Sequence, residues 1–153
     1  MTNENNVASK RHRLIIWSAS FSLLLAIGMA CGGESYAPRS IDVPMLEVNN
    51  SGQSGNAVLR STSLTTSEAH IRLNVSGAAY SDGQKVYIYA GTCDNLGEQA
   101  YRIKDILYGE SEPPTKLKVA LDALQTGNYV VNAHETDEAS SPSTACGAIP
   151  ALA

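Results

Sequence analysis

The sequence VYIYAGTCDNLG, from Val86 to Gly97, contains the pattern that decides the fold class. In a β-strand, alternation sends Val86 and Ile88 to one face and the rings of Tyr87 and Tyr89 to the other. The residues that follow, GTCDNLG, are rich in turn formers and contain a cysteine. The stretch therefore predicts a strand with an aliphatic face, a tyrosine face and a cysteine in the adjoining loop.

Short segments of the same kind recur along the chain, separated by breaks rich in Gly, Ser and Pro. In HIRLNVSG, for example, apolar and polar residues alternate strictly. We expect strands over residues 41–48, 56–63, 69–76, 85–90, 116–120, 128–134 and 145–149. The segment LDALQTG also fits one helical turn. The pattern predicts an all-β protein, an antiparallel Greek-key β-sandwich of about seven to eight strands.

The N-terminus has the layout of an export signal. A basic segment, residues 10–13, precedes the apolar run of residues 14–30, and Cys31 follows. GMAC followed by GG resembles the bacterial lipoprotein signal, in which the cysteine becomes the lipid-bearing terminus, although Gly28 stands where such signals usually have Leu. Lipidation of Cys31 is the favoured interpretation. Simple cleavage near Ala30 and an uncleaved anchor are the alternatives.

These features divide the chain into a signal over residues 1–30, a flexible tether over 31–40 and one β-domain over 41–153. They predict a protein of the bacterial cell envelope, held on a membrane through Cys31. The glycine after that cysteine favours an outer-membrane lipoprotein that faces the periplasm or the surface.

The charge of the remaining chain limits its partners. Without the signal, eight of the 11 basic and 14 of the 15 acidic side chains remain, which gives a formal charge of −6. No basic stripe is present that could neutralise phosphates, so the sequence argues against nucleic acid as a partner. The acidic balance suits a monomer. An unidentified protein partner stays open.

Two cysteines remain once Cys31 is assigned to the lipid. Cys93 and Cys146 form an even pair in an exported protein, for which a disulfide is the default expectation. The bond would close a loop of 53 residues, because 146 minus 93 is 53. A loop of that size should stabilise the fold by about 4 kcal/mol.

Three stretches, in order, resemble the copper/zinc superoxide dismutase-like sandwich, and more closely the small bacterial secreted domains of that kind. GQSGNAVL, residues 52–59, is similar to the Gly-rich entry to the early hairpin. VYIYAGTCDNLG is similar to the family's HIHxGTCxxLG. GNYVVNAHETDEASSPSTACGAIP is similar to the strand that ends in a histidine and to the terminal ACGxI. The resemblance covers roughly residues 48–150 and implies the superoxide dismutase-like fold.

The resemblance also implies where functional residues stand. Tyr87 and Tyr89 occupy the positions of the two copper-binding histidines of HxH, and His134 that of the histidine at the end of a later strand. Cys93 and Cys146 occupy the positions of the family's disulfide. The family's long zinc loop is missing, because only residues 98–100 separate CDNLG from Tyr101. With two histidines after the signal, the chain lacks the nitrogen ligands that copper redox chemistry needs, so we expect no dismutase activity.

Each candidate residue also has an ordinary structural interpretation. We expect His134 to be an exposed histidine at a strand end, because a metal needs partners that converge. We expect Tyr87 and Tyr89 to pack across a half-exposed strand with hydrated hydroxyl groups. If the three side chains meet, they form a candidate ligand or recognition site. His70, in a predicted strand, shows no sign of a catalytic triad.

The sequence therefore predicts an exported, lipid-anchored, non-catalytic superoxide dismutase-like domain that acts as a binding or structural module of the envelope. No catalytic residue, cofactor or confident metal ligand is predicted. The alternative is a metal-handling protein with a degenerate copper site at Tyr87, Tyr89 and His134. The two hypotheses differ in geometry, because a site requires the imidazole and the phenol oxygens to converge.

Overall fold

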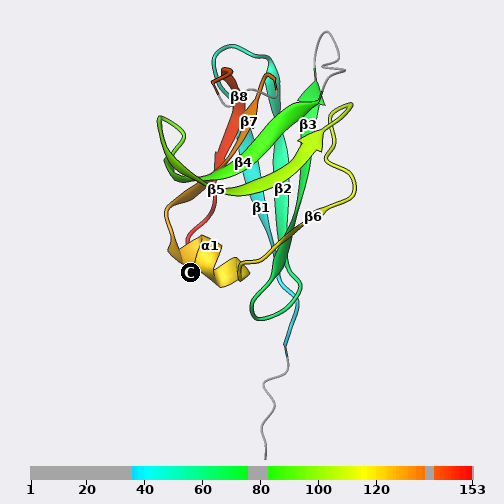
Figure 1. The fold of residues 1–153 in the computed structure, drawn as a ribbon, viewed down its shortest axis with the longest axis vertical. Coiled ribbons are helices and arrows are strands. Elements are labelled where there is room, and N and C mark those ends of the chain that lie inside the picture. The colour runs from blue at the N-terminus through cyan, green and yellow to red at the C-terminus, as the bar shows by residue number, and fades with distance from the viewer. Residues whose placement is uncertain (1–35, 76–82, 137–139, 153) are drawn as a thin grey trace, which may run out of the picture. The chain divides into compact units, whose positions relative to one another are not determined.

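The computed structural model describes residues 36–75, 83–136 and 140–152. These residues are all-β apart from one short helix (Figure 1). The elements are β1 (Ser40–Glu47), β2 (Gln53–Ser61), β3 (Ser67–Val75), β4 (Gln84–Thr92), β5 (Asn95–Ile106), β6 (Thr115–Leu117), α1 (Leu121–Thr126), β7 (Tyr129–His134) and β8 (Ser143–Ala148).

The eight strands pair antiparallel in the order β5-β4-β7-β8-β1-β2-β3-β6. Strand β1 joins two halves, because residues 40–45 pair with β2 whereas Leu46 and Glu47 pair with β8. In Figure 1, β4 and β5 cross in front of β1, β2 and β3. Three pairs of strands that are consecutive in the chain lie in different halves, namely β3 and β4, β5 and β6, and β6 and β7, as in a Greek key. The predicted all-β antiparallel fold is confirmed.

The main core lies between the two halves and follows the predicted alternation. In β3, Ile71 and Leu73 face inward while Arg72 and Asn74 are exposed. In β4, Val86 and Ile88 belong to this core and are completely buried. Helix α1 closes one end with Leu121. The other buried members come from both halves: Val43, Met45, Ala57, Leu59, Ala69, Ile103, Ile106, Leu117, Leu124, Val131, Ala133, Ala145 and Ile149.

Two glycines allow neighbouring strands to approach closely. A Cβ added to Gly55 of β2 would lie 2.0 Å from the carbonyl oxygen of Arg72 in β3. A Cβ on Gly147 of β8 would lie 2.4 Å from the carbonyl oxygen of Pro44 in β1. Side chains at these positions would push the strands apart. Close packing of the strands therefore explains the glycines in GQSGN and in the terminal ACG.

One strand was not predicted. The sequence predicts a loop at GTCDNLGE, but only a tight turn separates β4 from β5, because Thr92 pairs with Asn95. Strand β5 then runs for 12 residues along the end of the sheet order. Most of its side chains are exposed and its pairing with β4 has register shifts, so its sequence shows no clean alternation. LDALQTG forms the short helix α1.

Candidate functional site

The tyrosine face of β4 forms a second, smaller cluster on the side opposite the main core. Strand β7 lies beside β4 with Tyr87 opposite Asn132 and Tyr89 opposite Val130. Tyr87 and Tyr89 are each only 8% exposed. The expectation of a half-exposed tyrosine pair is therefore wrong. The residues that bury the rings come from several segments: Val48, Cys93, Leu96, Val130 and Cys146.

His134 stands at the end of β7 and points into this cluster. It is 3% exposed, so the expectation of an exposed strand-end histidine is wrong. The centroid of its ring lies 5.9 Å from that of Tyr87 and 5.8 Å from that of Tyr89, and the two tyrosine rings are 5.9 Å apart. The three rings meet edge to face or tilted, as aromatic rings prefer. The structure therefore brings together the three side chains that the sequence singled out. We call them the Tyr–His cluster.

Both ring nitrogens of His134 have partners within the protein. Nδ1 lies 2.9 Å from the carbonyl oxygen of Ser141, an acceptor, so Nδ1 carries the proton and donates. Nε2 is then the acceptor, and the hydroxyl of Tyr89 donates to it at 2.9 Å. The amide nitrogen of Asn132 lies 3.1 Å from the same Nε2 and also reaches Oγ of Ser143, at 2.9 Å. With the proton on Nδ1, two donors lie against the lone pair of Nε2.

The environment of Tyr89 keeps its hydroxyl protonated. Burial raises the pKa of Tyr89 above its ordinary value of about 10, and the neighbouring Tyr87 raises that pKa further. The phenol is therefore a donor at neutral pH, which matches its bond to Nε2 of His134. Next to the cluster, Oδ1 of Asn132 is buried and has no hydrogen-bond partner among the described residues.

The predicted disulfide is present beside the Tyr–His cluster. Cys93 lies in the β4–β5 turn and Cys146 in β8, with an S–S distance of 2.08 Å and a Cα–Cα distance of 5.8 Å. Cys146 pairs with Asn132 of β7. The bond thus fixes the turn that carries Cys93 against the buried tyrosine face. Cys31 lies outside the described residues.

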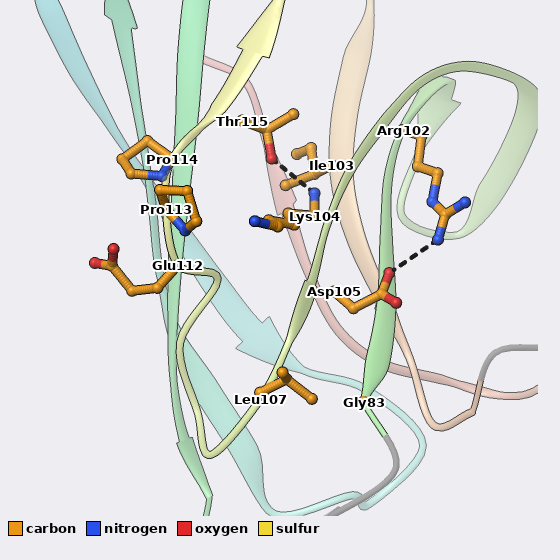
Figure 2. Close-up of a pocket in the computed structure, with 10 residues that line it drawn as sticks. All are labelled: Gly83, Arg102, Ile103, Lys104, Asp105, Leu107, Glu112, Pro113, Pro114 and Thr115. Carbon is orange, nitrogen blue, oxygen red and sulfur yellow. Dashed lines mark hydrogen bonds and ion pairs between the residues drawn. The ribbon is translucent and has the colours of Figure 1, made fainter.

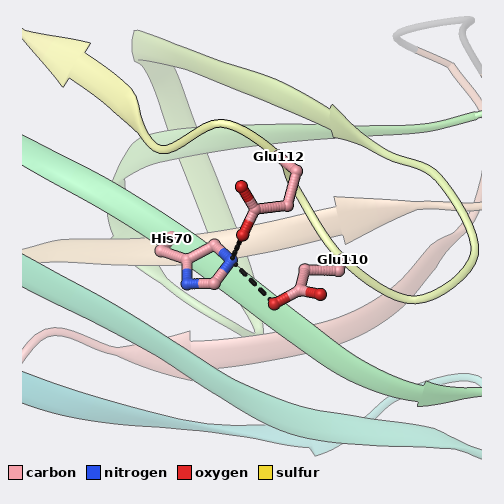
Figure 3. Close-up of side chains that lie close together, drawn as sticks. All are labelled: His70, Glu110 and Glu112. Atoms are coloured by element: carbon pink, nitrogen blue, oxygen red, sulfur yellow. Dashed lines mark ion pairs between the residues drawn. The ribbon is translucent and has the colours of Figure 1, made fainter.

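A second group of ionisable side chains lies on the outer face of β3, where no site is predicted from the sequence. Nε2 of His70 is 3.0 Å from Oε1 of Glu110 and 3.1 Å from Oε1 of Glu112 (Figure 3). The three ligand atoms lie within 4.8 Å of one another. We call these residues the His–Glu cluster. The only sequence signal for this cluster is the alternation in HIRLN and GESEP. It places residues 70, 72, 110 and 112 on outward positions.

A cleft of about 600 Å³ opens where the sheet order ends, between β5 and the segment that enters β6. Figure 2 shows Ile103, Lys104 and Leu107 on one side, and Glu112, Pro113 and Pro114 on the other. The backbone N–H of Lys104 donates to Oγ1 of Thr115 across this gap, at 2.7 Å. Glu112 therefore belongs both to the cleft and to the His–Glu cluster.

No family model, curated protein or solved structure matches the chain. Within the described residues, no helix is long and apolar enough to cross a membrane.

Proposed function

We propose that the protein is an exported, lipid-anchored, non-catalytic superoxide dismutase-like domain that acts as a binding or structural module of the bacterial cell envelope. One observation carries the proposal. Tyr87, Tyr89 and His134, which stand where the resemblance puts copper ligands, form a buried cluster closed by its own hydrogen bonds.

The chemistry of this cluster argues against copper redox catalysis. Copper that cycles between oxidation states needs several nitrogen ligands and an open coordination position. Here the cluster offers a single imidazole, and two donors already occupy its free nitrogen. A metal would have to displace the hydroxyl of Tyr89, which burial keeps protonated. The cluster is therefore better suited to hold β4 and β7 together than to bind a metal.

The placement of the motifs supports the resemblance on which the proposal rests. Tyr87 and Tyr89 lie on one face of β4, next to β7, which ends at His134. The cysteine of GTCDNLG is bonded to the cysteine of the terminal ACG. This disulfide joins the two cysteines whose positions correspond to the family's disulfide.

Copper titration of the purified full chain, beside a His134→Ala variant, tests the non-catalytic part. We expect the two proteins to bind the same amount of copper, because the Tyr–His cluster contributes no ligand. Tyr129→Phe is the matched control, since this tyrosine of β7 packs on the main core and lies outside the Tyr–His cluster. A stoichiometric copper ion that is lost in His134→Ala, but retained in the control, would overturn the proposal.

The alternative, a metal-handling protein with a degenerate copper site, has one observation in its favour. Among the described residues, Oδ1 of Asn132 is a buried acceptor without a partner, in the side chain whose amide nitrogen contacts Nε2 of His134. A cation bound by these groups would satisfy it. The same titration separates the two functions, because this alternative requires the copper that His134→Ala removes.

We place the contact surface for a partner protein at the cleft between β5 and β6. The sheet is open there, and an extended segment of a partner can add to an exposed sheet edge. Leu107, which lines the cleft, is 50% exposed and the adjacent Tyr108 is 84% exposed, so both side chains are accessible to a partner. A photo-crosslinking residue at position 108, introduced in cells, should give a discrete protein adduct. The same residue at Leu64, an exposed apolar position in the β2–β3 turn, is the control. Equal labelling at both positions would contradict this assignment.

A further inference from the structure

We propose that His70, Glu110 and Glu112 form a binding site for one divalent transition-metal cation of the Zn²⁺ type. This inference is independent of the proposed function, because the His–Glu cluster lies on the outer face of β3 and shares no residue with the Tyr–His cluster.

Backbone hydrogen bonds hold the segment that carries Glu110 and Glu112 against β3, which carries His70. The segment after β5 turns back at Tyr108 and Gly109, both with positive φ, and Leu107 and Glu110 exchange backbone hydrogen bonds of 3.0 and 3.1 Å. It then follows β3, because the N–H of Leu73 donates to the carbonyl of Gly109 at 2.8 Å.

Ser111 completes this attachment to β3. Its N–H donates to the carbonyl of Ile71 at 3.0 Å, and its hydroxyl accepts from the N–H of Ile71 at 2.9 Å. Ser111 is completely buried, so its neighbours in this extended segment, Glu110 and Glu112, point outward. They meet His70, which is on the outward face of β3, as Figure 3 shows. The carboxylates are therefore held in position by backbone bonds.

Both distances from Nε2 of His70 to the carboxylate oxygens fit a shared cation. Zinc binds imidazole nitrogen and carboxylate oxygen at about 2.0–2.2 Å. At about 2.05 Å from a common ion, atoms that are 3.0–3.1 Å apart would subtend an angle of about 95°. That angle lies close to those of octahedral and tetrahedral coordination. One imidazole nitrogen and two carboxylate oxygens form a donor set suited to Zn²⁺ and similar divalent ions.

The surroundings of Nε2 of His70 favour a cation as its partner. Nε2 is buried, and although both carboxylate oxygens are within ion-pair distance, neither lies in line with a proton on Nε2. Three lone-pair donors thus converge without an aligned hydrogen between them. A cation at their centre satisfies all three at once. Glu112, which is 59% exposed and lines the cleft, leaves a path for the ion and a position for water.

Arg72 is the competing cation. Its Nε donates to Oε1 of Glu110 at 2.5 Å, and its side chain is 68% exposed. Because the positive charge of Arg72 lies next to the proposed ion, it should weaken metal binding. Removal of Arg72 should therefore strengthen binding. A set of ion pairs without a metal site predicts no such gain.

The test is calorimetric titration of the purified full chain with Zn²⁺, repeated with Co²⁺, whose visible absorption reports its ligands. We expect one equivalent to bind. His70→Ala and Glu112→Gln should each weaken binding by more than about tenfold, and Arg72→Ala should tighten it. Glu68→Gln, which removes an acidic group of β3 that pairs with Arg60, should leave binding unchanged.

Glu112→Gln keeps the test decisive if His70→Ala fails to fold, because Glu112 is exposed and the replacement is isosteric. The absence of binding at millimolar Zn²⁺ would overturn the proposal, as the cluster would then be a set of ion pairs only. Binding that is equal in wild type and Glu112→Gln would also overturn it. Neither result would affect the proposed function, which depends on the Tyr–His cluster.

Discussion

The hydrogen bond from Tyr89 to His134 gives a quantitative prediction. Tyr89→Phe removes one buried hydroxyl but leaves Nε2 of His134 with the amide of Asn132, at 3.1 Å. The imidazole is therefore not left without a donor, and the free energy of unfolding should fall by about 1 kcal/mol. His134→Ala removes the bonds to Tyr89, Asn132 and Ser141 and leaves a cavity, so it should cost about 3 kcal/mol.

Urea unfolding at 25 °C, with the disulfide intact, measures these changes. For an m-value of about 2 kcal/mol/M, Tyr89→Phe should shift the midpoint by about 0.5 M. The double variant, Tyr89→Phe with His134→Ala, should be more stable by about 0.5–1 kcal/mol than the sum of the single effects predicts. The reason is that the Tyr89 hydroxyl, which His134→Ala alone leaves without its partner, is absent from the double variant. Tyr87→Phe is the control, since no hydrogen bond to the Tyr87 hydroxyl occurs among the described residues; it should change stability by less than about 0.5 kcal/mol. Equal effects of the two Tyr→Phe changes, together with zero coupling, would refute the reasoning.

Three further predictions concern the disulfide, the high-pH stability and the anchor. Replacing Cys93 and Cys146 together by Ala should lower the free energy of unfolding by about 4 kcal/mol, because their bond closes a loop of 53 residues; an unchanged urea midpoint would contradict this. Burial raises the pKa of Tyr89, so its contribution to stability is complete below about pH 10 and is lost as the pH rises through the folded-state pKa. An absorbance titration should therefore show a late phenolate step that Tyr89→Phe removes, and its persistence in the variant would count against the assignment. Cys31→Ser should abolish lipidation and release the protein from the membrane fraction, whereas an unchanged mass and fractionation would argue for another kind of processing.

The strands of the core could be predicted because their two faces differ. In β3 and β4 the inward residues are aliphatic, and this period of two is readable without any knowledge of the partners. The edge strand β5 could not be predicted in this way. It pairs with β4 on one side only, and the side chains of its first half are mostly exposed, so only its second half, with Ile103 and Ile106, contributes to the core.

The identity of the Tyr–His cluster followed from sequence, but its burial did not. Alternation placed Tyr87 and Tyr89 on one face, and the resemblance added His134. The groups that cover this face, including Val48 and Leu96, come from remote segments. Sequence periodicity says which residues share a face but not what packs on it. The same limit hid the His–Glu cluster, which requires the segment after β5 to lie along β3.

The two histidines have opposite roles in these proposals. His134 is enclosed in the Tyr–His cluster, whereas His70 is open to a cation. Correlation of the imidazole ¹H and ¹⁵N resonances of the full chain, before and after addition of Zn²⁺, tests this most directly. We predict that the proton of His134 sits on Nδ1 and that its ring is unchanged by Zn²⁺, whereas the resonances of the His70 ring move with one equivalent. A proton on Nε2 of His134, or a His134 ring that responds to the metal, would contradict the central claim.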